Sequence, residues 1–417
     1  MLTDQAIVSA GNFGLNILLA RSFSEMDYGA FTLILSFVLF LNTLHQAFVI
    51  FPLSVEGAAA PPSSLGYFLA LAASLTALEA ILFFPVISGA TLSVGRLALL
   101  LPASLFLLAW QLQEVWRRGL IARGRYGAAI GNDFVRYIVV LTVLMAMDHL
   151  KLLSLQSVFI LLVAASLLTC WPLLAPLLAE GRRVRQTLRS ELRAHWRMVA
   201  PVLGANLLAV LSTQWFLWLL AWGHDLASSA ALVALANIAG FASPVMYGLE
   251  NILVPEIARQ RDSLTFTALM QLVWRRGVAG ALLVLPFFAI VLIWPAPVLH
   301  LFYGAHKSYS QFTLSLQMLA AAYITYLVAY VLGATLRGYR ASRAVLKMQL
   351  YPALMGITVG SWLTLRFGVS GACFAALIAG AMRVTIGWHY VTRLRTLTVP
   401  EGHVSAPCQV PDAAQGV

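Results

Sequence analysis

The chain has 417 residues, of which 60% are hydrophobic and only 10% are charged, and its formal net charge is +11. Soluble globular proteins carry about 25% charged residues, so this composition excludes an ordinary soluble domain and indicates a membrane protein. The excess of positive charge would suggest a nucleic-acid partner in a soluble protein, but no basic and aromatic module accompanies it, and we expect no nucleic-acid partner.

About twelve apolar segments follow one another along the chain. A membrane-spanning helix needs about 20 apolar residues to cross roughly 30 Å of hydrocarbon, and the first and fifth segments are the shortest. The pattern predicts an all-α integral membrane protein with about 12 transmembrane helices. The segments cover approximately residues 6–20, 29–51, 65–87, 97–116, 133–148, 153–179, 198–222, 229–254, 277–298, 313–335, 344–365 and 369–391.

The polar stretches between these segments are short. Residues 180–197 and 255–276 carry apolar residues at helical spacing, so we expect both to lie as helices along the inner membrane surface. Of the 27 lysines and arginines, 20 fall in alternate loops and only five in the loops between them. Positive charge is retained on the cytoplasmic side during insertion. The split therefore predicts a multi-pass protein with both termini in the cytoplasm.

The sequence contains signs of internal duplication. Leu18-Leu19-Ala20 precedes a turn and a long helix, and Leu219-Leu220-Ala221 does the same about two hundred residues later. Arg123-Gly124 and Arg337-Gly338 follow the fourth and tenth segments. Parallel repeats are typical of alternating-access transporters, with the binding site between the repeats. We therefore divide the chain into a six-helix lobe at 1–180, a basic linker at 181–197, a second six-helix lobe at 198–391 and a disordered cytoplasmic tail at 392–417.

Catalytic and cofactor signatures are missing from the sequence. Cys170, Cys373 and Cys408 lie far apart and lack metal-ligand spacing, so we expect no metal site. No glycine-rich phosphate loop followed by lysine is present, which indicates that this chain does not use ATP. The outer loops are short and carry no paired-aspartate motif. We expect a transporter that needs no cofactor rather than an enzyme.

Four stretches resemble bacterial oligosaccharide flippases, the Wzx-type polysaccharide biosynthesis proteins of the multidrug/oligosaccharidyl-lipid/polysaccharide (MOP) superfamily. The opening DQAIVSAGNFGLNILLARSFSEMDYGAFTL, residues 4–33, is similar to the start of that family. ARGRYGAAIGNDFVRY at 122–137, HWRMVAPVLGANLL at 195–208 and GLENILVPEIAR at 248–259 are similar to its middle regions. The resemblance touches most of residues 4–260, while the last third is similar only in hydropathy and in its Arg-Gly loop.

This resemblance implies a function as well as a fold. Members have two six-helix lobes around a central cavity and move an undecaprenyl-pyrophosphate-linked oligosaccharide across the bacterial inner membrane, for surface polysaccharide or exopolysaccharide synthesis. The implied partners are membrane lipid, the lipid-linked oligosaccharide, and polysaccharide polymerases, synthases or export proteins. Two alternatives stay open: a proton- or sodium-coupled drug or metabolite antiporter of the same superfamily, and a membrane-embedded polysaccharide polymerase or ligase.

Polar side chains inside apolar segments are candidates for the cavity wall, because they are costly unless they face protein or water. Amides in such positions also serve as hydrogen-bonding links between helices. Near the inner helix ends we expect interfacial ion pairs, Glu114 with Arg117 and Arg118, and Glu250 with Arg259. The cavity candidates from the amides and one histidine are Asn12, Asn16, Asn42, His45, Gln46, Asn237, Asn206, Gln214 and Asn251.

Charged residues at mid-depth need a partner, a cavity or a ligand, because insertion scales assign such a charge a cost of about 2.5–3.5 kcal/mol. Arg383 is our first candidate for binding an anionic head group, with a buried pair to a carboxylate as the alternative. Glu79 is a candidate for that carboxylate, for an ion-coupling site, or for a protonated core acid. Arg136 lies one turn inside its segment and could extend to the interface. It is also counted as a substrate-binding candidate.

The inner loops of the two repeats supply a last set of candidates. They could collect a pyrophosphate at the cytoplasmic mouth, or they could only fix topology and contact anionic lipid. These residues are Arg123, Arg125, Arg337 and Arg340.

Overall fold

The computed structural model describes residues 2–59, 61, 63–261 and 263–397, and every regular element within them is helical. The first helices are α1 (Leu2–Ser22), α2 (Glu25–His45), α3 (Phe51–Ala59), α4 (Leu65–Ser93), α5 (Leu100–Ala122), α6 (Tyr126–His149) and α7 (Leu155–Cys170). The later ones are α8 (Leu174–Gly223), α9 (Leu226–Ala239), α10 (Ser243–Gln260), α11 (Phe266–Ile293), α12 (Pro295–Tyr303), α13 (Thr313–Gly338), α14 (Ser342–Met355) and α15 (Ser361–Leu397).

Helices long enough to span a membrane occur along most of the described chain. Among the described residues, nine helical stretches are long and apolar enough to cross a bilayer. The last, Ser342–Leu394, is 53 residues long and contains Gly368, whose φ of 61° interrupts the helical backbone. Only glycine adopts this conformation at little cost. The break falls between the predicted segments 344–365 and 369–391, so the sequence placed this boundary correctly.

Two expectations about the polar stretches differ in outcome. Residues 180–197 are helical as predicted, but they belong to the 50-residue α8, which continues without a break to Gly223. Residues 255–276 do not form a separate surface helix: α10 extends to Gln260 and α11 begins at Phe266, capped by the Thr265 hydroxyl. Apolar residues at helical spacing cannot distinguish a surface helix from the projecting ends of two spanning helices. Of the tail predicted at 392–417, α15 takes in residues up to Leu397, and 398–417 lie outside the described residues.

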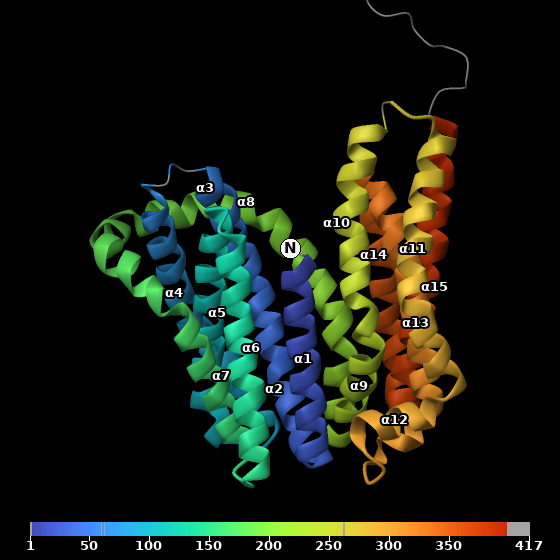
Figure 1. Cartoon of the computed structure of the whole chain (residues 1–417), viewed down its shortest axis with the longest axis horizontal. Helices are drawn as coiled ribbons and strands as arrows, with labels where there is room; N and C mark the ends of the chain where they lie inside the picture. Colours follow the sequence, from blue (N-terminus) through green and yellow to red (C-terminus); the bar gives the residue numbers. More distant parts are fainter. Residues whose placement is uncertain (1, 60, 62, 262, 398–417) are drawn as a thin grey trace, which may run out of the picture.

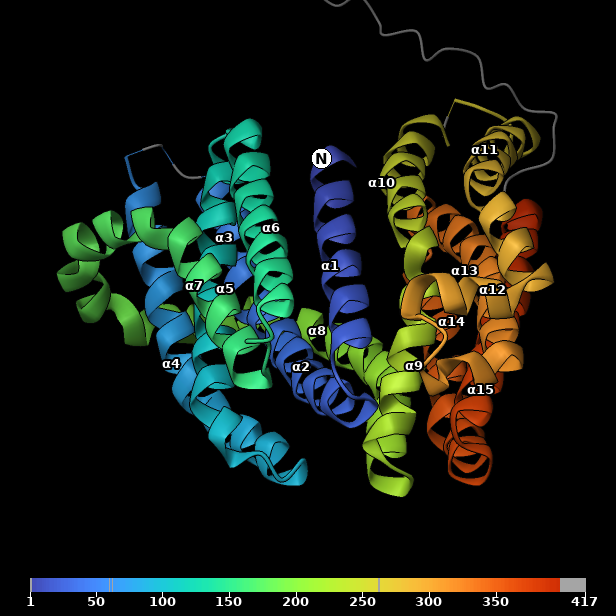
Figure 2. The same cartoon turned by 60° about the horizontal axis from the view of Figure 1, so that its bottom comes forward.

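Figure 1 shows the helices in two sets, α1 to α7 and α9 to α15, with α8 running from the first set to the second. In the first set α1 contacts α6, and α5 contacts α4 and α7; in the second, α13 contacts α10, α11 and α15. Helix α2 joins the sets through contacts with α8 and α9, and α1 adds contacts with α9, α10 and α12. Figure 2 shows α1 running between α6 and α10. The largest contact between the two sets is that of α2 with α9.

The turns after α5 and α13 have the same conformation, which also closes α4 and α6 at Gly95 and Lys151. After α5, Gly124 has a φ of 70° and the amide of Arg125 donates to the Leu120 carbonyl; after α13, Arg340 has a φ of 58° and the amide of Ala341 donates to the Leu336 carbonyl. Both are helix ends closed by a left-handed residue. Arg340, not Gly338, is thus the counterpart of Gly124. Gly338 is instead packed so closely that a Cβ would lie 2.5 Å from the Ile257 side chain.

Candidate functional site

The candidate polar residues gather in three places rather than in one. One group lines a cavity formed by α8, α10, α13, α14 and α15, and a second lines a cavity formed by the first helices. The third is a buried pair between α2 and α4. We name the two cavities after the arginines in them, the Arg383 cavity and the Arg136 cavity.

The Arg383 cavity has a volume of about 470 Å³. Its wall combines two arginines and a glutamate with hydroxyl and amide groups, and it is rich in aromatic rings. Tyrosines at positions 323, 326 and 330 share one face of α13 because they are spaced by three and four residues. The arginines are Arg337 and Arg383, the acid is Glu250, and the fourth tyrosine is Tyr247 on α10.

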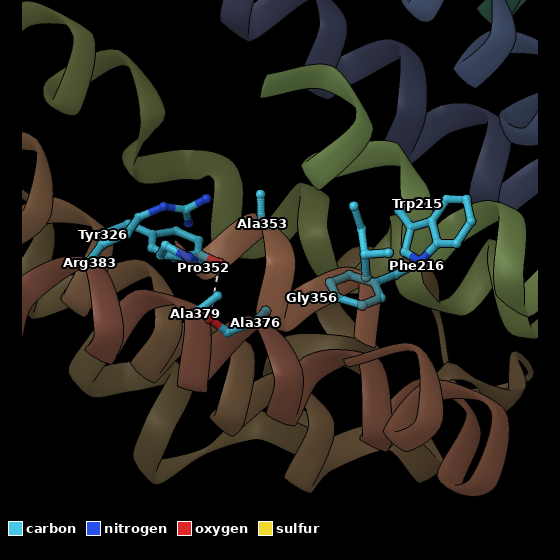
Figure 3. A pocket seen from close by; sticks show the side chains of 10 residues that line it. Trp215, Phe216, Tyr326, Pro352, Ala353, Gly356, Ala376, Ala379 and Arg383 are labelled. Atoms are coloured by element: carbon cyan, nitrogen blue, oxygen red, sulfur yellow. Dashed lines mark hydrogen bonds between the residues drawn. The ribbon is translucent and has the colours of Figure 1, made fainter. Parts of the chain in front are cut away.

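Arg383 is held at the edge of this cavity by the close approach of α13 and α15. Gly380 permits that approach, since a Cβ there would lie 2.0 Å from the hydroxyl oxygen of Thr325. The Arg383 guanidinium carbon lies 5.2 Å from the centre of the Tyr326 ring, and the Tyr326 hydroxyl donates to the Ala376 carbonyl at 3.0 Å. Figure 3 shows this arrangement in a small pocket that Arg383 and Tyr326 also line. Within the described part of the chain, the buried Nε of Arg383 has no hydrogen-bond partner.

Arg337 lies in the last turn of α13 and reaches into the same cavity. Its Nη2 is 3.0 Å from Glu250 Oε1. The expected pairing of Glu250 with Arg259 is therefore wrong, because α13 packs directly against α10 and brings Arg337 to that carboxylate. The other mouth candidates, Arg123, Arg125 and Arg340, are exposed on the turns that follow α5 and α13. The structure brings only Arg337 of this set together with Arg383.

The Arg136 cavity has a volume of about 280 Å³ and is lined by Asn12, Asn16, Arg136 and Tyr137 among mostly apolar side chains. Arg136 is 7% exposed, so the expectation that it reaches the interface is wrong. Asn12 accepts from the Tyr137 hydroxyl at 3.1 Å, and Asn16 accepts from the Tyr28 hydroxyl at 3.2 Å.

Asn237 extends this polar chain to α9. Its Nδ2 donates to the Tyr28 hydroxyl at 3.4 Å, which links the second set of helices to the wall of the Arg136 cavity. Asn12, Asn16, Arg136 and Asn237 are thus brought together as a group, away from Arg383.

The third place is a hydrogen-bonded pair between His45 on α2 and Glu79 on α4. His45 Nδ1 lies 2.7 Å from Glu79 Oε2, and both side chains are buried. Glu79 is therefore not the partner of Arg383. The similar depth of the two residues allowed that pairing, but α4 packs against α2 and brings Glu79 to His45 instead. Asn42 and Gln46 lie beside His45, where α2 passes into a π-helical turn, Gln46–Ile50. Such turns occur frequently at functional sites.

Other sequence expectations have mixed outcomes. Glu114 is bonded by Arg118 at 2.7 Å and by Arg117 at 3.2 Å, as predicted. Asn251 is exposed, and the side chain of Asn206 lies outside the described residues. The sequence reasoning missed the tyrosines of the Arg383 cavity and Trp110 beside Arg136. The helical spacing of the tyrosines was a usable signal, but aromatic residues are common enough in apolar segments to mask it.

At the end of the molecule opposite the α5–α6 turn, polar contacts connect the two sets of helices. The Glu25 carboxylate accepts from the backbone amide of Ser308 at 2.7 Å and from its hydroxyl at 2.6 Å. The Lys307 ammonium donates to the Phe23 carbonyl, and Arg21 donates to the Leu301 carbonyl at 3.4 Å. Burial lowers the pKa of Lys307, while the Glu25 carboxylate opposes that shift. These contacts hold this end of the molecule together.

Comparison with known proteins places the fold. No protein-family model and no curated protein matches the sequence. An inward-facing multidrug resistance MATE family transporter of the MOP superfamily superposes with a TM-score of 0.74 at 12% identity, over 95% of this chain and 96% of that one. The lipid II flippase MurJ in an inward closed conformation gives 0.71 at 15% identity, over 93% and 86%. An outward-facing MATE family transporter of the MOP superfamily gives 0.63 at 12% identity, over 95% and 94%.

The chain therefore has the fold of MOP-superfamily transporters and is a multi-pass membrane protein. This fold agrees with the fold that the resemblance in the sequence implies.

Proposed function

We propose that this protein is a flippase of the bacterial inner membrane that moves a lipid-linked oligosaccharide, of the undecaprenyl-pyrophosphate type, toward the outer leaflet. In this proposal the chain forms twelve spans in two six-helix lobes, with both termini in the cytoplasm. The observation that carries the proposal is the Arg383 cavity, where two arginines and four tyrosines share one wall.

The chemistry of this wall suits a phosphorylated sugar. Arginine offers several donors and a permanent charge, which match the oxygens of a diphosphate. Tyrosine rings present flat apolar faces with a polar edge, which suit a pyranose ring. Carrying these polar parts through hydrocarbon unaided would leave many groups without hydrogen bonds, each costing several kcal/mol. A cavity of about 470 Å³ holds the first part of such a head group while the lipid tail stays in the bilayer.

Two observations support an assignment of this conformation to the inward-facing state. The chain superposes better on the inward-facing MATE family transporter than on the outward-facing one, with TM-scores of 0.74 and 0.63 at the same identity of 12%. The polar contacts around Glu25, Lys307 and Ser308 close the end that the charge distribution assigns to the outside. Substrate would then enter from the cytoplasmic side.

The test is a deletion of the gene in the native host. We expect surface polysaccharide to be lost while lipid-linked repeat units accumulate on the inner leaflet, because synthesis continues without export. Surface polymer and inner-leaflet repeat units are measured in the same cells, and the wild-type gene on a plasmid restores both. Normal surface polymer in the deletion strain would refute the proposal.

A second candidate function is a proton- or sodium-coupled antiporter, and the His45–Glu79 pair favours it. Ionisable residues buried in spans commonly mark ion pathways. This pair also sits where α2 enters its π-helical turn, on the helix that packs against α8 and α9. Loading of an ion there would act directly on the contact between the two sets of helices.

Replacing Glu79 by Gln distinguishes the two functions. Gln can keep a hydrogen bond to His45, but it cannot take up a proton and lacks the negative charge that attracts a sodium ion, so an antiporter would lose gradient-driven transport. Under the flippase proposal we expect head-group flipping in vesicles without an ion gradient to be unchanged. The measurement is outer-leaflet exposure of a fluorescent prenyl-pyrophosphate sugar. Glu180→Gln is the matched control, because Glu180 makes only a partly exposed ion pair with Arg183 at 3.8 Å. Loss of gradient-free flipping in Glu79→Gln alone would contradict this prediction.

A further inference from the structure

Arg136 lies inside the Arg136 cavity without a counter-charge. Its side chain is 7% exposed, and its Nε is a buried atom with no hydrogen-bond partner among the residues that the structure describes. Asp133, one turn earlier on α6, is the nearest acid in sequence, but its Oδ2 lies 2.7 Å from Arg117 Nε. The carboxylate that could have neutralised Arg136 is therefore already paired.

The aromatic side chains around Arg136 do not supply the missing negative charge. Its guanidinium carbon lies 5.8 Å from the centre of the Trp110 ring and 5.5 Å from that of Tyr137. Such cation–π contacts orient a guanidinium, but they offer it no oxygen to bond. Arginine stays protonated in proteins, and a buried charge without a partner is strongly unfavourable. A charged group from outside the described chain is the simplest way to satisfy it.

The remainder of the cavity indicates what carries that group. Leu35, Leu39, Phe106 and Leu162 form an apolar wall, while Asn12 and Asn16 add polar atoms beside Arg136. A volume of about 280 Å³ accommodates a phosphate or carboxylate together with a short length of alkyl chain. The Arg383 cavity is larger, and different residues line it in the described part of the molecule.

We propose that the Arg136 cavity is a second ligand site, which binds the anionic group of an amphiphile through Arg136 and its apolar chain along Leu35, Leu39 and Leu162. The ligand class is a phosphate or carboxylate at the end of an alkyl or prenyl chain. A bilayer lipid and a soluble or transported phosphate ester are the two possible sources. The inference does not depend on what the Arg383 cavity transports.

The test counts sites for octyl phosphate on the full-length protein in a neutral detergent, by equilibrium dialysis. If both cavities bind octyl phosphate, we expect two sites on the wild type and one on Arg136→Gln. If only the Arg136 cavity binds it, we expect one site on the wild type and none on Arg136→Gln. The matched control is Arg125→Gln, which removes the same charge from an exposed turn next to α6 and should keep the wild-type number. Equal numbers of sites in Arg136→Gln and the wild type would overturn the proposal, whether or not the Arg383 site exists.

A second variant guards against misfolding of Arg136→Gln. Leu39→Trp fills the apolar wall and leaves Arg136 in place, so we expect it also to lose one site. If inorganic phosphate competes at the Arg136 site as well as octyl phosphate does, the alkyl chain of the ligand contributes nothing to binding. The assignment of an amphiphile is then wrong.

Native mass spectrometry after purification from membranes containing phosphatidylglycerol identifies the source. A bound anionic lipid that the wild type and Arg125→Gln retain, and that Arg136→Gln lacks, makes the ligand a bilayer lipid. Loss of an octyl phosphate site without such a retained lipid makes it a phosphate ester from another source. Both results support the site.

Discussion

Replacement of Arg383 by Gln is expected to weaken binding of a phosphorylated head group by about 10- to 100-fold and to abolish flipping at low substrate concentration. A hydrogen bond to a charged group contributes about 1.5–3 kcal/mol, and about 1.4 kcal/mol corresponds to a tenfold change in affinity. The variant should fold normally, because Arg383 contacts Tyr326 but forms no ion pair with a carboxylate among the described residues, so its loss frees no buried acid. The measurement is the affinity of the purified protein for a short prenyl-pyrophosphate sugar.

Two further variants serve as controls for this binding experiment. Arg340→Gln removes the same charge from an exposed turn, so its affinity should match the wild type. Glu250→Gln removes the carboxylate that pairs with Arg337 at 3.0 Å and faces the same cavity, so it should tighten binding of an anion. Opposite signs for Arg383→Gln and Glu250→Gln would be hard to obtain from general damage to the fold. Wild-type affinity in Arg383→Gln with unchanged thermal stability would remove Arg383 from the site.

The sequence predicted the helices better than it predicted the partners. Apolar runs long enough to span a bilayer must form helices, because no other open structure satisfies the backbone there. The Gly368 break and the helical linker at 180–197 followed from local patterns of this kind. The depth of Arg383 in its span marked it as needing a partner, a cavity or a ligand, and in the structure Arg383 lines a cavity.

Partner identity is a property of packing, and the sequence could not supply it. Hydropathy places Glu79 and Arg383 at similar depth, but it does not say that α4 faces α2 and that α15 faces α13. Glu79 consequently pairs with His45 rather than with Arg383. The depth of Arg136 suggested a route to the interface, yet Trp110 and Tyr137 cover it. In both cases a residue on another helix, His45 on α2 or Trp110 on α5, contributed to the outcome.

Replacement of Gly29 by Val is the second change from which we expect a large effect. A Cβ at Gly29 would lie 2.0 Å from the carbonyl oxygen of Leu226 and 2.6 Å from its carbonyl carbon, both backbone atoms at the start of α9. A side chain cannot move such a neighbour aside by changing rotamer, so α2 and α9 must separate. Overpacking of this kind typically costs about 1–3 kcal/mol. We expect a lower midpoint of thermal unfolding in detergent.

The same substitution reports on the transport cycle, because α2 and α9 belong to different sets of helices. If their contact is made in the inward-facing state and released in the outward-facing state, Gly29→Val favours release. A cysteine at position 230, where Ala230 is fully buried on α9, should then react faster with a water-soluble maleimide in the Gly29→Val background. Gly131→Ala is the control: a Cβ there meets nothing within 4 Å, and alanine in a helix is favoured over glycine by up to about 1 kcal/mol. Its unfolding midpoint should stay level or rise. Unchanged stability and labelling in Gly29→Val would mean that the α2–α9 contact tolerates separation and does not hold this conformation.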